Sequence, residues 1–135
     1  AGISSGVISA IITGASYIMV AGVAWIAGSE IAKIHKKNKN KHYFKAKLDD
    51  GKNDVFVGNS ITKSVAIQRI KSGKSIFVIG AKKAKKVCKQ ASSIKKAVFH
   101  LGEKGEGYYP HYHRGYYEKG KLRSGHGHAW YVNAS

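Results

Sequence analysis

Four of the seven histidines of this chain lie in two His-x-His pairs near its C-terminal end, His111/His113 and His126/His128. Side chains two residues apart on a β-strand project from the same face, so each pair can present two imidazoles to one site. Imidazole is the side chain whose unperturbed pKa lets it both accept and donate a proton near neutral pH. Among the cations of the same segment, Arg114, Lys121 and Arg123 are candidates to hold a phosphate. Histidines beside cations are the groups that cleavage of a phosphodiester requires.

The charge of the chain indicates what it binds. Its 24 Lys and Arg residues against 7 Asp and Glu residues give a formal net charge of +17 over 135 residues. Such a balance implies a polyanionic partner, which can be a nucleic acid, an anionic membrane or an acidic protein. The single cysteine, Cys88, excludes an internal disulfide and a cysteine-based zinc site, and we expect it to be a small buried residue.

The N-terminal part has a different composition. Residues 1–29 carry no charge, and small residues recur every fourth position at Gly2, Gly6, Ala10 and Gly14. We expect residues 1–34 to form an apolar, glycine- and alanine-rich helical segment. Residues 7–28 are about long enough to contact or cross a bilayer, and close packing of a helical hairpin is the other interpretation. Residues 35–41 are predicted to be a basic linker, and residues 42–135 a basic α+β domain.

Within that domain the pattern predicts a small antiparallel or mixed sheet with two helices. The apolar run of residues 75–79 is typical of a central strand that is buried on both faces. Asn59 or Ser60 is expected to cap the first helix, which ends near Lys71. The expected strands are residues 42–48, 54–58, 75–79, 95–101, 108–113 and 126–132, and the second helix is residues 81–91.

The second predicted helix is amphipathic, with a lysine face that we interpret as a phosphate-binding surface. Aromatic side chains can add stacking faces for unpaired bases. The predicted nucleic-acid-binding residues are Lys82, Lys83, Lys85, Lys86, Lys89, Tyr109, Tyr117 and Trp130.

RNA is the simplest substrate for such a site, because its 2′-hydroxyl is a built-in nucleophile. The protein then needs a base, an acid and a cation near the phosphate. We predict metal-independent catalysis without a cofactor, in which His111, His113 and His128 supply the acid and the base. The cations Arg114, Lys121 and Arg123 would hold the phosphate.

Two alternatives to this mechanism stay open, and a two-metal DNase is not one of them. The carboxylates that Mg²⁺ requires are scarce near the histidines, which disfavours a two-metal DNase. A transition metal bound by histidines alone is possible, with His111, His113, His126 and His128 as candidate ligands. The chain can also be a nucleic-acid-binding module without catalysis, in which the histidines are structural.

The order of elements resembles the C-terminal toxin domains of bacterial polymorphic toxins of the Rhs, contact-dependent-inhibition and LXG types. The resemblance covers about residues 42–132. It rests mainly on His111-Tyr112-His113 and on the ending Gly127-His128-Ala129-Trp130-Tyr131. Where many of those domains have proline after His-Tyr-His, this chain has Arg114.

The resemblance implies an antibacterial effector, often a nuclease, that is secreted or delivered from one bacterium and acts in the cytoplasm of another. It carries His111, His113 and His128 over as the motif histidines and leaves His126 without a role. It also implies an acidic immunity protein as a partner. A membrane-active toxin that acts through residues 1–29 is the alternative within this class.

Overall fold

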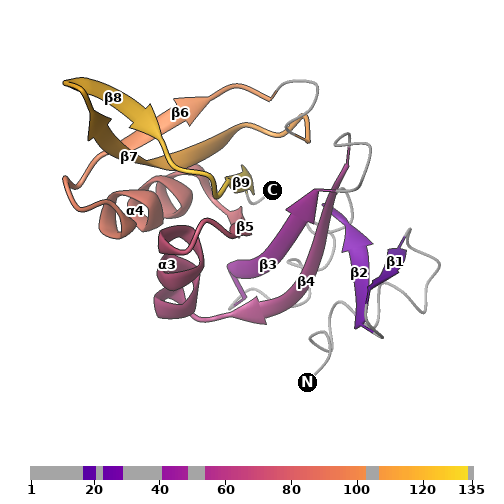
Figure 1. The fold of residues 1–135 in the computed structure, drawn as a ribbon. Helices are drawn as coiled ribbons and strands as arrows, with labels where there is room; N and C mark the ends of the chain where they lie inside the picture. The colour runs from indigo at the N-terminus through magenta and orange to yellow at the C-terminus, as the bar shows by residue number, and fades with distance from the viewer. Residues whose placement is uncertain (1–16, 21–22, 29–40, 49–53, 103–106, 134–135) are drawn as a thin grey trace.

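The computed structural model of the chain describes residues 17–20, 23–28, 41–48, 54–102 and 107–133. They form an α+β fold, as the sequence predicts, in which one mixed sheet is flanked by two helices (Figure 1). The strands are β1 (Tyr17–Val20), β2 (Val23–Ala27), β3 (Tyr43–Leu48), β4 (Val55–Ile61), β5 (Ser75–Ile79), β6 (Ala97–His100), β7 (His111–Glu118), β8 (Lys121–Ser124) and β9 (Ala129–Val132). The helices are α3 (Lys63–Lys71) and α4 (Ala81–Ala91).

The strand order in the sheet is β1-β2-β4-β3-β5-β9-β7-β6, and β8 pairs with β7 alone. Strands β5 and β9 run parallel, and the other pairs of described strands are antiparallel. The connection from β5 to β9 therefore contains α4, β6 and the β7–β8 hairpin. This arrangement places the C-terminal strand β9 between β5 and β7, at the centre of the C-terminal half of the sheet.

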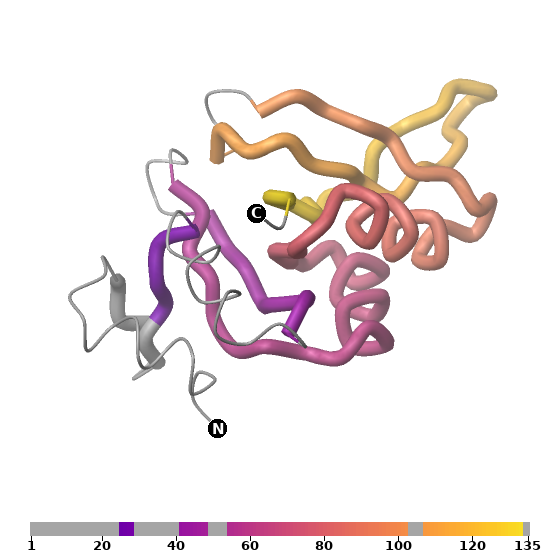
Figure 2. Tube along the Cα trace, turned by 180° about the vertical axis from the view of Figure 1, so that it is seen from behind, coloured from indigo at the N-terminus to yellow at the C-terminus, as the bar shows by residue number. Residues whose placement is uncertain are grey.

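The core has two parts, one on each face of the sheet. Ile76 and Val78 of β5 pack with α3 and α4 on one face, whereas Phe77 and Ile79 pack with Trp130 on the other. This division follows from the alternation of side chains along a strand and explains why the run of residues 75–79 is continuously apolar. Figure 2 shows the two helices side by side on the same side of the sheet.

Helix α4 has the bounds and the buried face that its amphipathic pattern predicts. Ala84, Val87, Cys88 and Ala91 are buried, and the lysines lie on the opposite side. Burial raises the pKa of the Cys88 thiol to about 12, so this cysteine is a packing residue and not a nucleophile.

The start of the first helix was predicted wrongly. Asn59 and Ser60 belong to β4, which continues to Ile61, and Thr62 caps α3 by accepting a hydrogen bond from the Val65 N–H at 3.2 Å. The pairing of β4 with β3 extends to Ile61↔Tyr43. Asn59 and Ser60 therefore lie within the sheet, although both residue types favour helix caps.

The described part of the expected N-terminal helical segment is also different. Residues 17–20 and 23–27 form an antiparallel strand pair, and β2 continues the sheet by pairing with β4. Ile26 is fully buried in the core beside Phe44. The β-branched and aromatic residues of this stretch favour strands. The small residues at positions 2, 6, 10 and 14 lie outside the described residues, as do residues 35–40 of the predicted linker 35–41. Neither α3 nor α4, the helices of the described residues, has the length and apolarity that crossing a bilayer requires.

Candidate functional site

Four histidines from three segments of the chain converge at the C-terminal half of the sheet. His111 and His113 project from the same face of β7 and are 0% and 4% exposed. His100 of β6 pairs directly with His111, and its ring lies 5.4 Å from that of His111 and 4.6 Å from that of His113, measured between centroids. His128 precedes β9, and its ring lies 4.9 Å from His111 and 4.6 Å from His113. We refer to these four residues as the histidine cluster.

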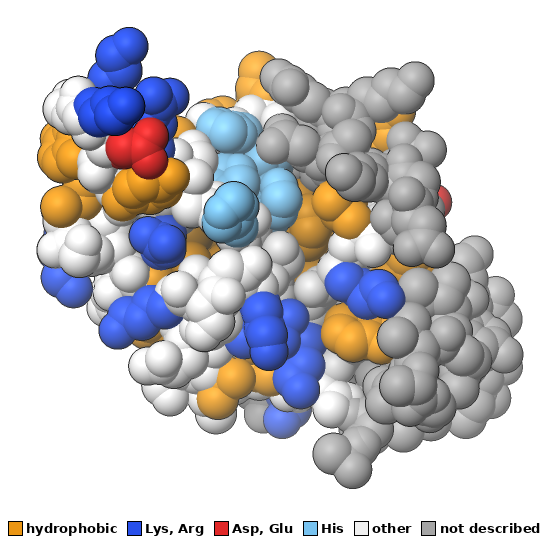
Figure 3. All heavy atoms as spheres, in the orientation of Figure 1, with side chains coloured by type: hydrophobic (Ala, Val, Ile, Leu, Met, Phe, Trp, Pro, Cys, Tyr) orange, Lys and Arg blue, Asp and Glu red, His pale blue; other side chains and the backbone are white. Residues whose placement is uncertain are grey.

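The cluster has a buried side and an open side. His111 and His113 are buried, whereas His100 and His128 are half-buried. Figure 3 shows histidine side chains gathered on the surface of one face of the molecule, with Lys and Arg side chains distributed around them on the same face. A molecule from solvent can therefore reach the outer rings of the cluster, while the inner rings are held by the fold.

Backbone carbonyls fix the two inner rings. The Nδ1–H of His111 donates to the carbonyl oxygen of Tyr109 at 2.9 Å, and the Nδ1–H of His113 donates to that of Gly125 at 2.8 Å. A carbonyl oxygen can only accept, so Nδ1 carries the proton in both rings. In the neutral state the lone pair of each ring is therefore on Nε2, and both Nε2 atoms are buried.

His128 is positioned by a serine and a tryptophan. Its backbone N–H donates to the Ser75 hydroxyl at 3.0 Å, and the same hydroxyl lies 3.5 Å from its Nδ1. Its ring stacks on Trp130 at a centroid distance of 4.6 Å and an interplanar angle of 3°. Gly127 allows this approach, because a Cβ there would lie 2.4 Å from the carbonyl oxygen of Lys74.

The surroundings keep His128 neutral. Burial, followed by the neighbouring rings of His113, His111 and His100, lowers the pKa of His128 from 6.5 to about 3. An anion that binds beside the ring would oppose both effects and raise its basicity. The cluster thus holds a neutral imidazole whose proton affinity an adjacent anion would increase.

The three predicted phosphate-holding cations do not share the face of the inner histidines. Arg114 follows His113 on β7, so its side chain projects from the opposite, helix-covered face of the strand. In the β7–β8 register Lys121 pairs with Glu118 and Arg123 with Tyr116, which are on the same face as Arg114. Arg123 also lies 4.0 Å from the Glu118 carboxylate. The strand alternation therefore turns these three side chains away from the face that carries His111 and His113.

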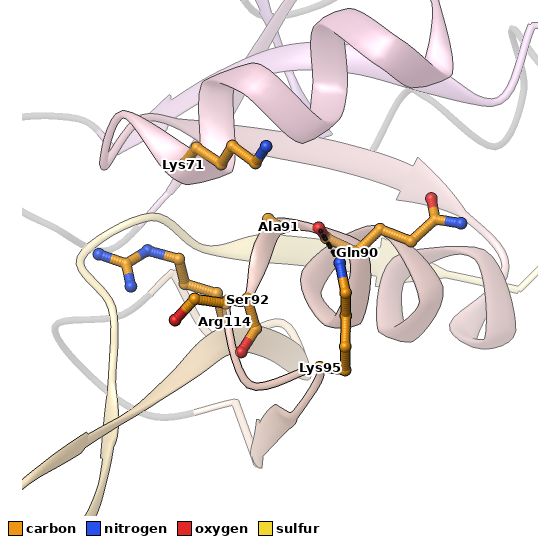
Figure 4. A pocket seen from close by; sticks show the side chains of 7 residues that line it. Lys71, Gln90, Ala91, Ser92, Lys95 and Arg114 are labelled. Atoms are coloured by element: carbon orange, nitrogen blue, oxygen red, sulfur yellow. Dashed lines mark hydrogen bonds between the residues drawn. The ribbon is translucent and has the colours of Figure 1, made fainter.

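Arg114 instead lines a cavity of about 350 Å³ between the two helices and β7. Figure 4 shows Lys71 of α3, the C-terminal end of α4, Lys95 and Arg114 around it. The Lys95 ammonium donates to the Gln90 carbonyl oxygen at 3.5 Å. The buried Nε of Arg114 makes no hydrogen bond within the described residues, so a donor remains for an anion.

A second hollow, of about 480 Å³, continues this cavity along α4 and shares Gln90 and Lys95 with it. The two hollows together form what we call the basic groove, and no acidic side chain is among the described residues that line it. The groove contains four of the five predicted lysines, Lys82, Lys85, Lys86 and Lys89. Lys83 is exposed on α4 but does not line it.

The three aromatic residues that were predicted to stack bases have different environments. Trp130 is 1% exposed, because β9 is a central strand, so it cannot stack a base, and that prediction was wrong. The half-buried Tyr109 contacts Phe77 edge to face at 5.2 Å. Tyr117 is 51% exposed, so part of its ring is accessible to a base. Its hydroxyl accepts a hydrogen bond from the Lys96 ammonium at 2.9 Å.

Sequence reasoning included one histidine that the cluster lacks and missed one that it contains. His126 is exposed and lies near the turn at Gly73. Because β9 begins only at Ala129, residues 126–128 are not in a strand, and the spacing of His126 and His128 does not place them on one face. His100 was not among the candidate residues. It lies in the strand predicted at residues 95–101, which directly precedes the predicted His-x-His strand, and pairing of these two neighbouring strands was the signal that could have found it.

No protein-family model, curated protein or solved structure matches this chain. The likeness to polymorphic-toxin domains therefore depends on the motif residues alone, and the site must be interpreted from its own geometry.

The lowered pKa of His128 predicts a pH dependence of stability in chelator-treated protein. The unfolded chain binds a proton at this ring near pH 6.5 and the folded chain only near pH 3, so the free energy of unfolding falls as the pH drops through that window. One such group contributes a slope of at most about 1.4 kcal/mol per pH unit. We expect His128→Gln to flatten the dependence in urea unfolding curves measured from pH 7 to 4. The exposed His126→Gln should leave it unchanged, and equal slopes in wild type and His128→Gln would contradict the assignment.

Proposed function

We propose that this domain is an antibacterial effector that cleaves RNA at the histidine cluster, with His128 as the general base. The observation that carries the proposal is the position of His128. It is a neutral, half-buried imidazole at the open side of a cluster whose inner rings are fixed by the backbone. A strongly basic domain with such a site is suited to a polyanionic substrate that brings its own nucleophile.

The reaction requires one proton to be removed and one to be supplied. His128 takes the proton of the 2′-hydroxyl while the 2′-oxygen attacks phosphorus. The bond from phosphorus to the 5′-oxygen then breaks, and that oxygen takes a proton from water. The products are a 2′,3′-cyclic phosphate and a 5′-hydroxyl end. The phosphate anion beside His128 raises the basicity of the ring when it is needed.

The basic groove supports the choice of nucleic acid as substrate. Its end at Arg114 lies close to the cluster, because a Cβ on Gly125 would lie 2.7 Å from Arg114 Cγ and the Gly125 carbonyl accepts the His113 hydrogen bond. The groove and the cluster are thus on opposite faces of β7 but meet at Gly125. A flexible single strand can follow the groove and bend around this edge, which a rigid duplex does less readily.

The cleavage proposal predicts that the folded protein degrades total bacterial RNA. We expect His128→Ala to reduce the rate by about 10²-fold or more, the usual contribution of a general base. His126→Ala removes a histidine two residues away that lies outside the cluster, and it should retain the wild-type rate. The measurement is a gel assay with RNA and with plasmid DNA, each with and without EDTA. Intact RNA after incubation with folded wild-type protein would refute the proposal, and cleavage that EDTA abolishes would refute a metal-independent mechanism.

The basic groove predicts where RNA affinity resides. Lys85→Gln together with Lys89→Gln should weaken binding of a single-stranded RNA. The slope of log K against log salt should become shallower by about 0.7 for each phosphate that the double variant no longer neutralises. Lys119→Gln together with Lys121→Gln removes the same charge at the tip of the β7–β8 hairpin and is the matched control. Fluorescence anisotropy at several salt concentrations checks this, and equally weakened binding by the two double variants would mean that only net charge matters.

An acidic immunity protein is the partner that an effector of this charge requires in the producing cell. Opposite charges give fast association that slows as the salt concentration rises. We expect an acidic protein encoded beside the gene to protect cells that express the domain, and to bind it with an association rate that falls between low and physiological salt. Stopped-flow mixing measures the rate. Lack of protection by every neighbouring acidic protein would contradict the effector proposal.

A further inference from the structure

We propose that His100, His111 and His113 bind one first-row transition metal ion, of which zinc is the representative. The three residues each offer a ring nitrogen, and these ligand atoms lie within 4.8 Å of one another. Two of the rings come from one strand and the third from its paired neighbour, so the sheet register itself holds the ligands together. This set differs from the one that the His-x-His spacing suggests, because it contains His100 and excludes His126.

The inner rings are oriented as metal ligands usually are. A histidine that binds a metal through one nitrogen generally donates its other N–H to a carbonyl or a carboxylate, which fixes the tautomer. His111 and His113 both donate Nδ1–H to backbone carbonyls, so both present the lone pair of Nε2. The third ring is also anchored, since His100 Nε2 lies 3.3 Å from the Ser124 hydroxyl. The hydrogen bonds that orient the ligands of a metal site are therefore already in place.

The donor set determines the class of ion. Imidazole nitrogens suit zinc, nickel, cobalt and copper, whereas magnesium and calcium require oxygen ligands. Within the described residues the group consists of histidines alone. Zinc binds imidazole nitrogen at about 2.0–2.1 Å, so two ligand atoms on one ion lie at most roughly 4 Å apart. The ligand atoms lie within 4.8 Å of one another, so binding requires one ring to move inward by less than its own width. His100, which is half-buried on the terminal strand β6, is the ring that can move.

His128 borders this site without belonging to the ligand group. Ser75 and the stacked Trp130 hold its ring beside His111 and His113. Three protein ligands leave a coordination position for a molecule from solvent, which distinguishes catalytic zinc sites from closed structural ones. An ion there would also place positive charge on the face from which Arg114, Lys121 and Arg123 are turned away.

The test measures metal binding directly, with tag-free, chelator-dialysed protein and without RNA. We expect one equivalent of Zn²⁺ to bind in isothermal titration calorimetry, one equivalent of Co²⁺ to give visible ligand-field absorption, and Mg²⁺ to give neither. His100→Ala should lower the affinity at least tenfold, as should His113→Ala if it folds. His100 is half-buried, so its variant is the less disruptive of the two. His126→Ala, which removes an exposed histidine outside the group, should bind like the wild type.

Two results would overturn the site. One is folded wild-type protein that takes up no Zn²⁺ or Co²⁺. The other is equal binding by wild type, His100→Ala and His126→Ala, which would assign the ion to other groups. The proposed metal site and the proposed RNA cleavage are tested independently of each other. Zinc binding without cleavage removes the proposed function and keeps the site, whereas cleavage without zinc binding removes the site and keeps the function.

Discussion

The C-terminal half of this fold depends on the burial of two imidazoles, His111 and His113, on one strand. A buried polar group costs free energy unless it is hydrogen-bonded, so each ring requires an acceptor at a defined place. The Tyr109 carbonyl supplies one before β7, and the Gly125 carbonyl supplies the other after the β7–β8 hairpin. The path of the chain on both sides of β7 is thus tied to the same two rings. The segment that carries His128 follows from Gly125, and its position is constrained in turn.

The alternation of β7 separates two kinds of chemistry. Residues 111 and 113 face the cluster, whereas Tyr112 and Arg114 face the helices. One strand therefore carries imidazoles on one side and a guanidinium on the other. The two features come close to each other at Gly125, where a side chain would collide with Arg114. A substrate that uses both features must be long and flexible, and this is a property of single-stranded nucleic acid more than of a small anion.

Sequence patterns were sufficient where one local signal dominated. The apolar run of β5 and the amphipathic face of α4 predicted both elements with the observed bounds. Sequence patterns were insufficient where strand pairing determined the bounds of an element. The ladder with β3 extends β4 through Asn59 and Ser60, and the late start of β9 removes His126 from the strand that its spacing suggested. His100 joins the cluster through the β6–β7 register, a long-range pairing that a lone histidine does not reveal. The fold class could be predicted, but the membership of the cluster required the register.

The burial of the histidine cluster costs this small domain free energy of folding. Each buried ring loses hydration, and positive charge on one ring repels positive charge on its neighbours. Both effects lower the pKa of His128. A core that needed only to be stable could place apolar side chains here, as it does around Phe77 and Ile79. Strained or polar cores persist where a site requires them. Metal ligation and general-base catalysis, the two proposed uses of the cluster, both require rings that are neutral and oriented before a cation or a phosphate binds, and either would account for this cost.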